Sequence, residues 1–143
     1  MSPVFIWPVR VYYEDTDAGG VVFYANYLKY MERARTEWLR HLGIGQERLR
    51  REQGVIFAVR AASLEYLRPA VLDDLLHVTA RVTDRRRASL VIEHEIRRHD
   101  GAGTPELLNR GEVKIACLDA GKFMPRPIPA LIVDAMTAGD SEQ

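Results

Sequence analysis

The chain has 143 residues, of which 47% are hydrophobic, a size and composition typical of one soluble domain with its own core. Lysine plus arginine and aspartate plus glutamate both number 20, so the formal net charge is zero, which argues against a general nucleic-acid binder and leaves no charge barrier to self-association. No apolar run approaches the roughly 18 residues of a membrane-spanning helix, and no secretory signal begins the chain. The single cysteine, Cys117, excludes an intrachain disulfide. We therefore expect a cytoplasmic protein without membrane insertion.

The beginning of the chain predicts a short strand and then a polar turn. Residues 9–13 are rich in β-branched and aromatic side chains, as strands are. Residues 14–20, EDTDAGG, are a cluster of turn formers. Asn26 follows a short apolar stretch and is a residue type suited to a helix N-cap.

A long helix is the clearest element that the sequence predicts. Between Tyr27 and Leu42, hydrophobic residues recur at spacings of three and four, which makes one broad apolar stripe. Gly43 stands where a left-handed C-cap belongs. Residues 46–53 predict a short polar helix that ends before Gly54.

The second half of the chain predicts four strands joined by turns. Each strand alternates hydrophobic and polar residues or is rich in β-formers, and the four cover residues 55–67, 76–82, 90–97 and 112–117. Turn formers separate them at residues 73–74, 84–87, 100–101 and 119–121. One strand, one long helix and four further strands predict an α+β fold with a five-stranded antiparallel sheet wrapped around the helix. Such a sheet has open edges, so we expect at least a dimer.

Motifs that are missing exclude several classes of enzyme. The sequence has no serine-hydrolase elbow, Walker loop, dinucleotide-binding glycine motif or zinc-binding His-Glu-x-x-His helix. Four histidines are scattered along the helix end and the strands, without metal-ligand spacing: His41, His77, His94 and His99. We expect no metal site and no cofactor, so any chemistry must come from carboxylates and backbone dipoles.

The acidic loop before the long helix is the candidate site. Asp17 is placed to act as a general base on water or to attack a carbonyl itself. The helix that begins near Asn26 offers free N–H groups for a developing oxyanion. Gly19 and Gly20 let the backbone fold tightly against a substrate, and we assign these two glycines and Asn26 to substrate binding. The alternative is that Asp15 and Asp17 only shape a turn, as aspartates often do.

Residues 11–39, VYYEDTDAGGVVFYANYLKYMERARTEWL, closely resemble the signature of hotdog-fold thioesterases of the 4-hydroxybenzoyl-CoA thioesterase type. Within that family the chain looks most like the acyl-CoA thioesterases associated with the Tol–Pal system. The resemblance runs over residues 7–129, so we assign residues 1–143 to a single hotdog domain with its core at 7–129 and a C-terminal tail at 130–143. It implies hydrolysis of an acyl-CoA thioester without a metal or prosthetic group. It also implies homodimers or homotetramers built from dimers, with active sites at subunit interfaces.

The same resemblance implies roles for single residues. Asp17 matches the family's catalytic aspartate, acting as general base or as nucleophile through an anhydride. Tyr24 matches the position whose backbone N–H polarises the thioester carbonyl. Close relatives often carry histidine where Phe23 or Tyr24 stands, so no imidazole-assisted step is expected here. Arg85 and Arg87 are candidates to bind coenzyme A phosphates, although a charged turn between strands is an equal interpretation.

Other assignments compete with this one. Glu32 and Glu37 lie on the helix, where a second hotdog subgroup keeps its catalytic carboxylate, but helix-face ion pairs are the more common role. Cys117 fits a small core residue in a strand. A hotdog dehydratase would need a histidine in the site, and none occurs before residue 41. The remaining alternative is an acyl-CoA-binding or scaffold protein that organises envelope or lipid-synthesis proteins. Among acyl groups, the Tol–Pal-like resemblance favours aliphatic ones.

Overall fold

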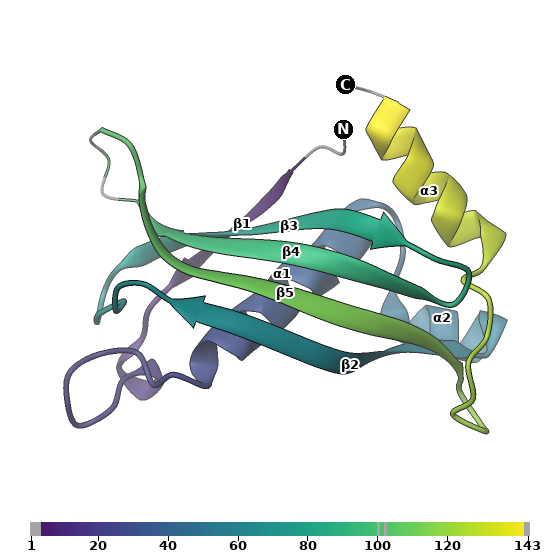
Figure 1. The fold of residues 1–143 in the computed structure, drawn as a ribbon, viewed down its shortest axis with the longest axis horizontal. Helices are drawn as coiled ribbons and strands as arrows, with labels where there is room; N and C mark the ends of the chain where they lie inside the picture. Colours follow the sequence, from purple (N-terminus) through teal and green to yellow (C-terminus); the bar gives the residue numbers. More distant parts are fainter. Residues whose placement is uncertain (1–3, 100, 102, 142–143) are drawn as a thin grey trace.

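The computed structural model describes residues 4–99, 101 and 103–141, and it shows a curved sheet with one long helix on its concave side (Figure 1). The elements in chain order are β1 (Phe5–Arg10), the 3-10 turn η1 (Tyr13–Asp15), α1 (Asn26–His41), α2 (Gln46–Gln53), β2 (Val55–Tyr66), β3 (Leu75–Arg85), β4 (Ser89–Arg98), β5 (Glu106–Asp119) and α3 (Ala130–Ser141). The predicted turn at residues 100–101 lies partly outside the described residues, since Asp100 is not among them.

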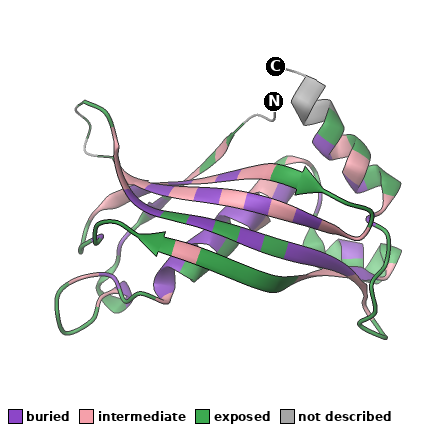
Figure 2. Ribbon diagram, in the orientation of Figure 1, coloured by how far each residue is buried: buried purple, intermediate pink, exposed green. Residues whose placement is uncertain are grey.

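The five strands form one antiparallel sheet in the order β1-β3-β4-β5-β2. The predicted α+β class, with a five-stranded antiparallel sheet around one helix, is therefore confirmed. The edges are unequal, because β1 has 6 residues and includes Pro8, a residue that suits an edge, whereas β2 has 12. Most of β2 is exposed along its length (Figure 2).

The core lies between α1 and the concave face of the sheet. Alternate residues of β4 are buried from Leu90 to Ile96, as expected for a strand with one face on a core. Tyr30, Met31 and Ala34 on α1 are 0% exposed. A Cβ atom on Gly111 of β5 would lie 2.8 Å from the Met31 Cε atom, so the absence of a side chain at 111 lets α1 approach the sheet.

The predicted helix ends at Gly43 and Gly54 are confirmed. Gly43 and Gly54 both have positive φ, at 85° and 69°, and α2 covers the predicted residues 46–53. Among the described residues, no helix is both long and apolar enough to cross a membrane.

Several boundaries differ from the sequence predictions, and among them β5 begins at Glu106 and not at residue 112, while β3 extends to Arg85 and not to residue 82. The first strand is Phe5–Arg10 and not residues 9–13, because the chain leaves the sheet after Arg10 and turns through η1. Residues 130–141, assigned to a tail, form α3, whose Ile132 and Met136 are buried against the core. Burial of these two side chains removes apolar surface from water, which favours packing of the helix against the core.

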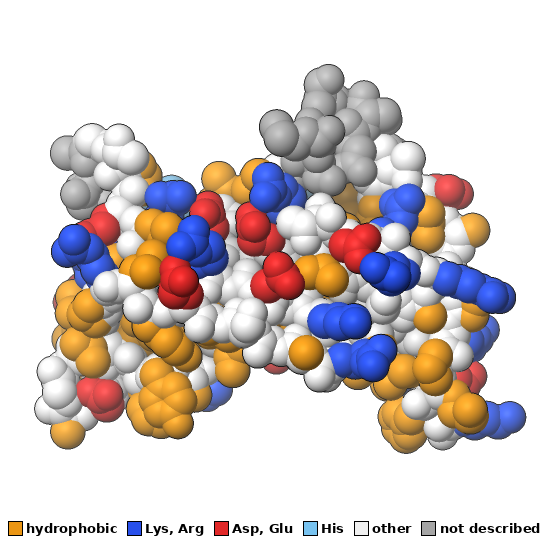
Figure 3. Space-filling model, in the orientation of Figure 1, with side chains coloured by type: hydrophobic (Ala, Val, Ile, Leu, Met, Phe, Trp, Pro, Cys, Tyr) orange, Lys and Arg blue, Asp and Glu red, His pale blue; other side chains and the backbone are white. Residues whose placement is uncertain are grey.

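Figure 3 views the outer, convex face of the sheet. Charged side chains of both signs are spread across it, and they include the cross-strand pairs Arg81–Glu93 at 2.7 Å and Arg110–Glu65 at 2.6 Å. Hydrophobic side chains gather at the two lower corners of this view, and the lower left corner lies over the loop that precedes α1.

Candidate active site

The acidic loop forms a small hairpin in front of α1. Thr16 and Val22 form an antiparallel bridge, and the Asp17 N–H donates to the Val21 carbonyl at 2.9 Å. A second bridge joins Val21 to Val71, in the segment before β3. The neck of the hairpin is therefore held by the body of the protein, while its tip, from Asp17 to Gly20, is exposed.

Asp17 sits at this exposed tip. Its carboxylate Oδ1 accepts a hydrogen bond of 2.8 Å from the Gly19 N–H. A Cβ atom at Gly19 would lie 3.2 Å from that oxygen, and Gly20 has φ of +81°, so both glycines suit the turn. Among the described residues, the other carboxylate oxygen of Asp17 has no hydrogen-bond partner. Asp17 thus shapes the turn with one oxygen and presents the second to solvent.

Asp15 braces the loop from inside. It is 8% exposed, and its Oδ2 accepts from the Tyr12 N–H at 2.9 Å. Its carbonyl oxygen accepts from the Phe23 N–H and from the Asn26 side-chain amide, at 2.9 and 2.8 Å. The predicted N-cap role of Asn26 is wrong: α1 begins at Asn26, Ala25 occupies the cap without a side-chain hydrogen bond, and the buried amide of Asn26 ties the helix to the loop.

Tyr24 presents its backbone and not its side chain. The residue is 65% exposed, and the centroid of its ring lies 4.8 Å from that of the Phe23 ring. Its carbonyl oxygen accepts a hydrogen bond of 3.1 Å from the Tyr66 hydroxyl at the end of β2. Its N–H donates to no acceptor in the described part of the chain. A free N–H just before α1 lies at the positive end of the helix dipole, where a developing negative charge is favoured.

The structure does not bring Arg85 and Arg87 to this loop within one chain. They lie at the turn between β3 and β4, and the Asp17 hairpin lies at the opposite end of the sheet (Figure 1). The Arg85 guanidinium donates to the Thr137 hydroxyl on α3, at 3.4 Å. Their assignment to coenzyme A phosphates stays a prediction that needs a second subunit or a long ligand.

Two of the competing candidates, Glu37 and Cys117, have structural roles. Glu37 pairs with Arg40, at 2.7 Å from Oε2 to the guanidinium. Cys117 is 0% exposed, and burial raises the pKa of its thiol, so it is a core residue as predicted. In the described part of the chain, no three His, Cys, Asp or Glu side chains are grouped to hold a metal.

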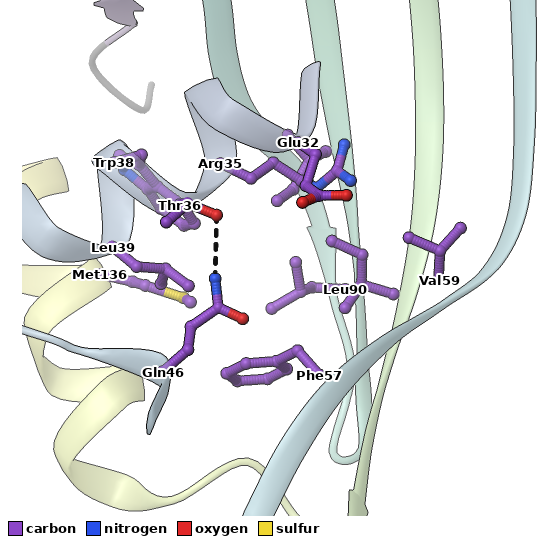
Figure 4. A pocket seen from close by; sticks show the side chains of 12 residues that line it. Glu32, Arg35, Thr36, Trp38, Leu39, Gln46, Phe57, Val59, Leu90 and Met136 are labelled. Carbon is purple, nitrogen blue, oxygen red and sulfur yellow. Dashed lines mark hydrogen bonds between the residues drawn. The ribbon is translucent and has the colours of Figure 1, made fainter. Parts of the chain in front are cut away.

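A cavity of about 360 Å³ lies between α1 and the sheet, and the sequence analysis did not single out its buried arginine, Arg35. Four polar side chains line it, Glu32, Arg35, Thr36 and Gln46, and its other walls are hydrophobic (Figure 4). A signal was present in the sequence, because Arg35 lies four residues after Met31 and four before Leu39, on the buried stripe of the helix. A charged residue at a core position often has a function.

Comparison with known proteins gives a consistent result. Residues 19–104 match the sequence family described as the thioesterase superfamily. The chain is 48% identical over 132 residues to the acyl-CoA thioester hydrolase YbgC of Escherichia coli, which covers 92% of this chain and 95% of that protein. A probable thioesterase from Bartonella henselae superposes with a TM-score of 0.82 at 32% identity, over 89% of this chain and all of that one. The 4-hydroxybenzoyl-CoA thioesterase of a Pseudomonas species has a TM-score of 0.84 at 21% identity, over 92% and 98% of the two chains, and shows likeness of fold alone.

Proposed function

This chain belongs to the thioesterase superfamily of hotdog-fold proteins, and we propose that it hydrolyses acyl-coenzyme A thioesters with the Asp17 carboxylate. The chain is an enzyme of the acyl-CoA thioesterase type, since 48% identity extends over nearly the whole length of a protein that bears this name. The observation that supports Asp17 is its second carboxylate oxygen, which has no partner among the described residues and stands at the exposed tip of a braced loop.

The proposed reaction needs two things that the loop offers. The carboxylate of Asp17 takes a proton from water as the water oxygen attacks the thioester carbonyl, or it attacks that carbonyl itself and water then opens the anhydride. The Tyr24 N–H and the start of α1 stabilise the negative charge that develops on the carbonyl oxygen. In both routes the carbon–sulfur bond breaks as this charge collapses, and the coenzyme A thiolate leaves and takes up a proton. In the second route this step forms the anhydride, and water opens it afterwards. The products are a free carboxylic acid and coenzyme A.

The test is thiol release, followed with DTNB over a panel of acyl-CoAs, for the wild type and Asp17→Asn. Asparagine keeps the oxygen that accepts from the Gly19 N–H, so the loop should persist while the base is lost. We expect kcat to fall by about 10²–10⁴. Glu14→Gln is the matched control, because Glu14 is an exposed carboxylate in the same loop, and its kcat should stay within about twofold of wild type.

Each other result points elsewhere. Full turnover in Asp17→Asn would remove Asp17 as the catalyst and turn attention to Glu32, which lines the cavity. No turnover on any acyl-CoA would favour the acyl-CoA-binding or scaffold interpretation, whose partner contacts should survive in Asp17→Asn. The acyl panel also tests the preference for aliphatic groups that the resemblance predicts.

We also propose that the chain forms a homodimer through β2, with a tetramer as a pair of such dimers. β2 is a 12-residue edge strand with exposed Val59 and Tyr66, and an open edge of this length favours pairing with another strand. Antiparallel pairing of two β2 strands about their midpoints would place Ala61 close to its own copy. Ala61→Lys should therefore weaken the dimer by like-charge repulsion in sedimentation experiments, whereas Leu131→Lys, at an exposed site on α3, should not. A monomeric wild type would refute this assembly.

A further inference from the structure

The connection between β2 and β3 holds the neck of the Asp17 hairpin. The Ala70 carbonyl accepts a hydrogen bond of 2.9 Å from the Val22 N–H, and Val71 forms the bridge to Val21. The Val21 carbonyl in turn accepts from the Asp17 N–H. The connection lies outside the helices and the strands of the sheet, so other contacts must fix its place and, with it, the place of the hairpin.

Arg98, the last residue of β4, contacts this connection on both sides of the two residues that touch the hairpin. Its Nη2 donates to the Pro69 carbonyl at 2.7 Å, and its Nε donates to the Asp74 Oδ2 at 2.9 Å. Pro69 and Asp74 flank Ala70 and Val71 in the chain. One guanidinium therefore holds both ends of the segment that supports the hairpin.

The contacts of Arg98 are themselves well supported. The Asp74 Oδ2 also accepts from the Val71 N–H at 2.9 Å, and the Arg98 Nη1 donates to the Glu106 Oε1 on β5 at 2.5 Å. The side chains of Arg98 and Asp74 are 26% and 14% exposed, which makes theirs the most buried ion pair among the described residues. Water and salt screen such a pair less than an exposed one, and hydrogen bonds between charged groups are the stronger ones.

We propose that Arg98 is a positioning residue of the thioesterase reaction, because it holds residues 69–74 in place and, through them, the neck of the hairpin that carries Asp17. This role rests on the proposed function of Asp17, whereas the physical link between Arg98 and the hairpin does not. Arg98 lies at the same end of the sheet as the hairpin, yet none of its hydrogen bonds among the described residues reaches the hairpin itself (Figure 1).

Arginine suits this task better than lysine. Its planar fork directs donors to several acceptors at once, whereas an ammonium is a single point of charge on a flexible stem. Catalysis is sensitive to such support, since a displacement of about 1 Å caused by a remote substitution can cost about 10²-fold in rate. An ordinary ion pair would stabilise the whole fold and leave the hairpin and kcat of the folded enzyme unchanged.

The first experiment tests the link without any substrate. Amide hydrogen exchange is followed by NMR in the full chain, and the Val22 rate is divided by the rate of Ile92, in the middle of β4, to correct for global opening. This ratio should rise at least about 10-fold in Arg98→Met, as expected for the loss of hydrogen bonds to a charged group. Arg81→Met is the matched control, because it removes a partly buried ion pair of β3 and β4 that does not touch residues 69–74. An unchanged ratio in Arg98→Met would overturn the proposal.

The second experiment measures thiol release with DTNB. Arg98→Met should lower kcat at least about 10-fold and leave KM within about twofold, while Arg81→Met keeps both near the wild-type values. Arg98→Met should also lower kcat of Asp17→Asn by less than it lowers kcat of the wild type. An equal fall in the two backgrounds would show that Arg98 does not act through Asp17 and would overturn the positioning role.

Two further results keep the proposals apart. Arg98→Lys keeps the positive charge and most of the stem, so it replaces Arg98→Met if that variant does not fold, and it too should raise the exchange ratio and lower kcat. Wild-type values of both in Arg98→Lys would refute the need for the fork. If the wild type hydrolyses no acyl-CoA, the proposed function fails, and the exchange ratio still decides whether Arg98 holds the hairpin.

Discussion

The buried His94 should make the protein labile to acid. Its imidazole is 0% exposed, and burial lowers its pKa from 6.5 to about 4, with the neighbouring Arg35 charge acting in the same direction and the hydrogen bond to the Thr79 carbonyl opposing both. The geometry explains the direction. The His94 Nε2 atom accepts a hydrogen bond from the Arg35 guanidinium. A proton on Nε2 would turn this acceptor into a donor that faces another donor, which disfavours the protonated imidazole.

The sign and size of the effect follow from proton binding. Because the folded pKa lies below the unfolded one, the unfolded chain binds more protons between pH 6.5 and 4, and the free energy of unfolding falls as the pH drops through that window. The difference of about 2.5 in pKa, at about 1.4 kcal/mol for each pKa unit, amounts to about 3 kcal/mol by pH 4. That is a large part of the stability of an ordinary domain.

The assay is urea unfolding at fixed protein concentration, at pH 7.5, 6.5, 5.5 and 4.5, for the wild type and His94→Gln. A glutamine amide can accept from Arg35 and donate to Thr79 but does not titrate. The stability advantage of the wild type over this variant should shrink by up to about 1.4 kcal/mol for each pH unit below 6.5. The lowered pKa of His77, caused by burial and by His99, acts on both proteins alike and cancels in the difference.

His41→Gln is the control, since His41 is exposed at the end of α1, and its stability should follow the wild-type pH profile. Parallel pH profiles for the wild type and His94→Gln would refute the reasoning. They would mean that His94 does not change protonation between the two states in this window.

Three further outcomes are expected. Gly111→Ala should lower the free energy of unfolding by about 1–3 kcal/mol, since its Cβ would lie 2.8 Å from the Met31 Cε. In urea unfolding, the double variant with Met31→Ala should recover part of that loss. Fully additive effects of the two substitutions would refute the contact. Tyr66→Phe removes the hydroxyl that donates to the Tyr24 carbonyl and should lower kcat/KM several-fold in the DTNB assay. Tyr24→Phe should leave kcat/KM near the wild-type value. A large loss of kcat/KM in Tyr24→Phe would give the Tyr24 hydroxyl a role. Asn109→Leu should raise the free energy of unfolding by about 1–3 kcal/mol, because neither polar atom of this buried amide has a hydrogen-bond partner among the described residues. A destabilised variant would show that the amide is hydrogen-bonded in solution.

The sequence by itself determined the order of the elements from β1 to β5 and the place of the acidic loop that carries Asp17. The helical stripe from Tyr27 to Leu42 and the alternating strands are local signals, because burial on one face dictates their period. The helix ends at Gly43 and Gly54 are local signals too, because the residue that follows a helix often adopts the left-handed conformation that glycine favours. The resemblance of residues 11–39 then supplied the family, which the comparisons confirm.

The tertiary structure decided what depends on residues far apart in the chain. Asn26 is a residue type that suits an N-cap, but its side-chain amide donates a hydrogen bond to the Asp15 carbonyl instead. Residue propensity alone does not predict which of these two roles the side chain takes. The segment at residues 130–141 became a packed helix because the open end of the core offered it apolar surface to cover.

The cavity and its buried arginine depend on the tertiary structure most of all. Arg35 and His94 are 59 residues apart and come into contact only when α1 packs on β4, so no local sequence pattern predicts their hydrogen bond. The sequence placed Arg35 on the buried stripe of the helix without saying what compensates its charge. Helix-to-sheet packing places a neutral imidazole on one side of the guanidinium and a cavity with polar and hydrophobic walls next to it, and it brings no ion-pair partner among the described residues.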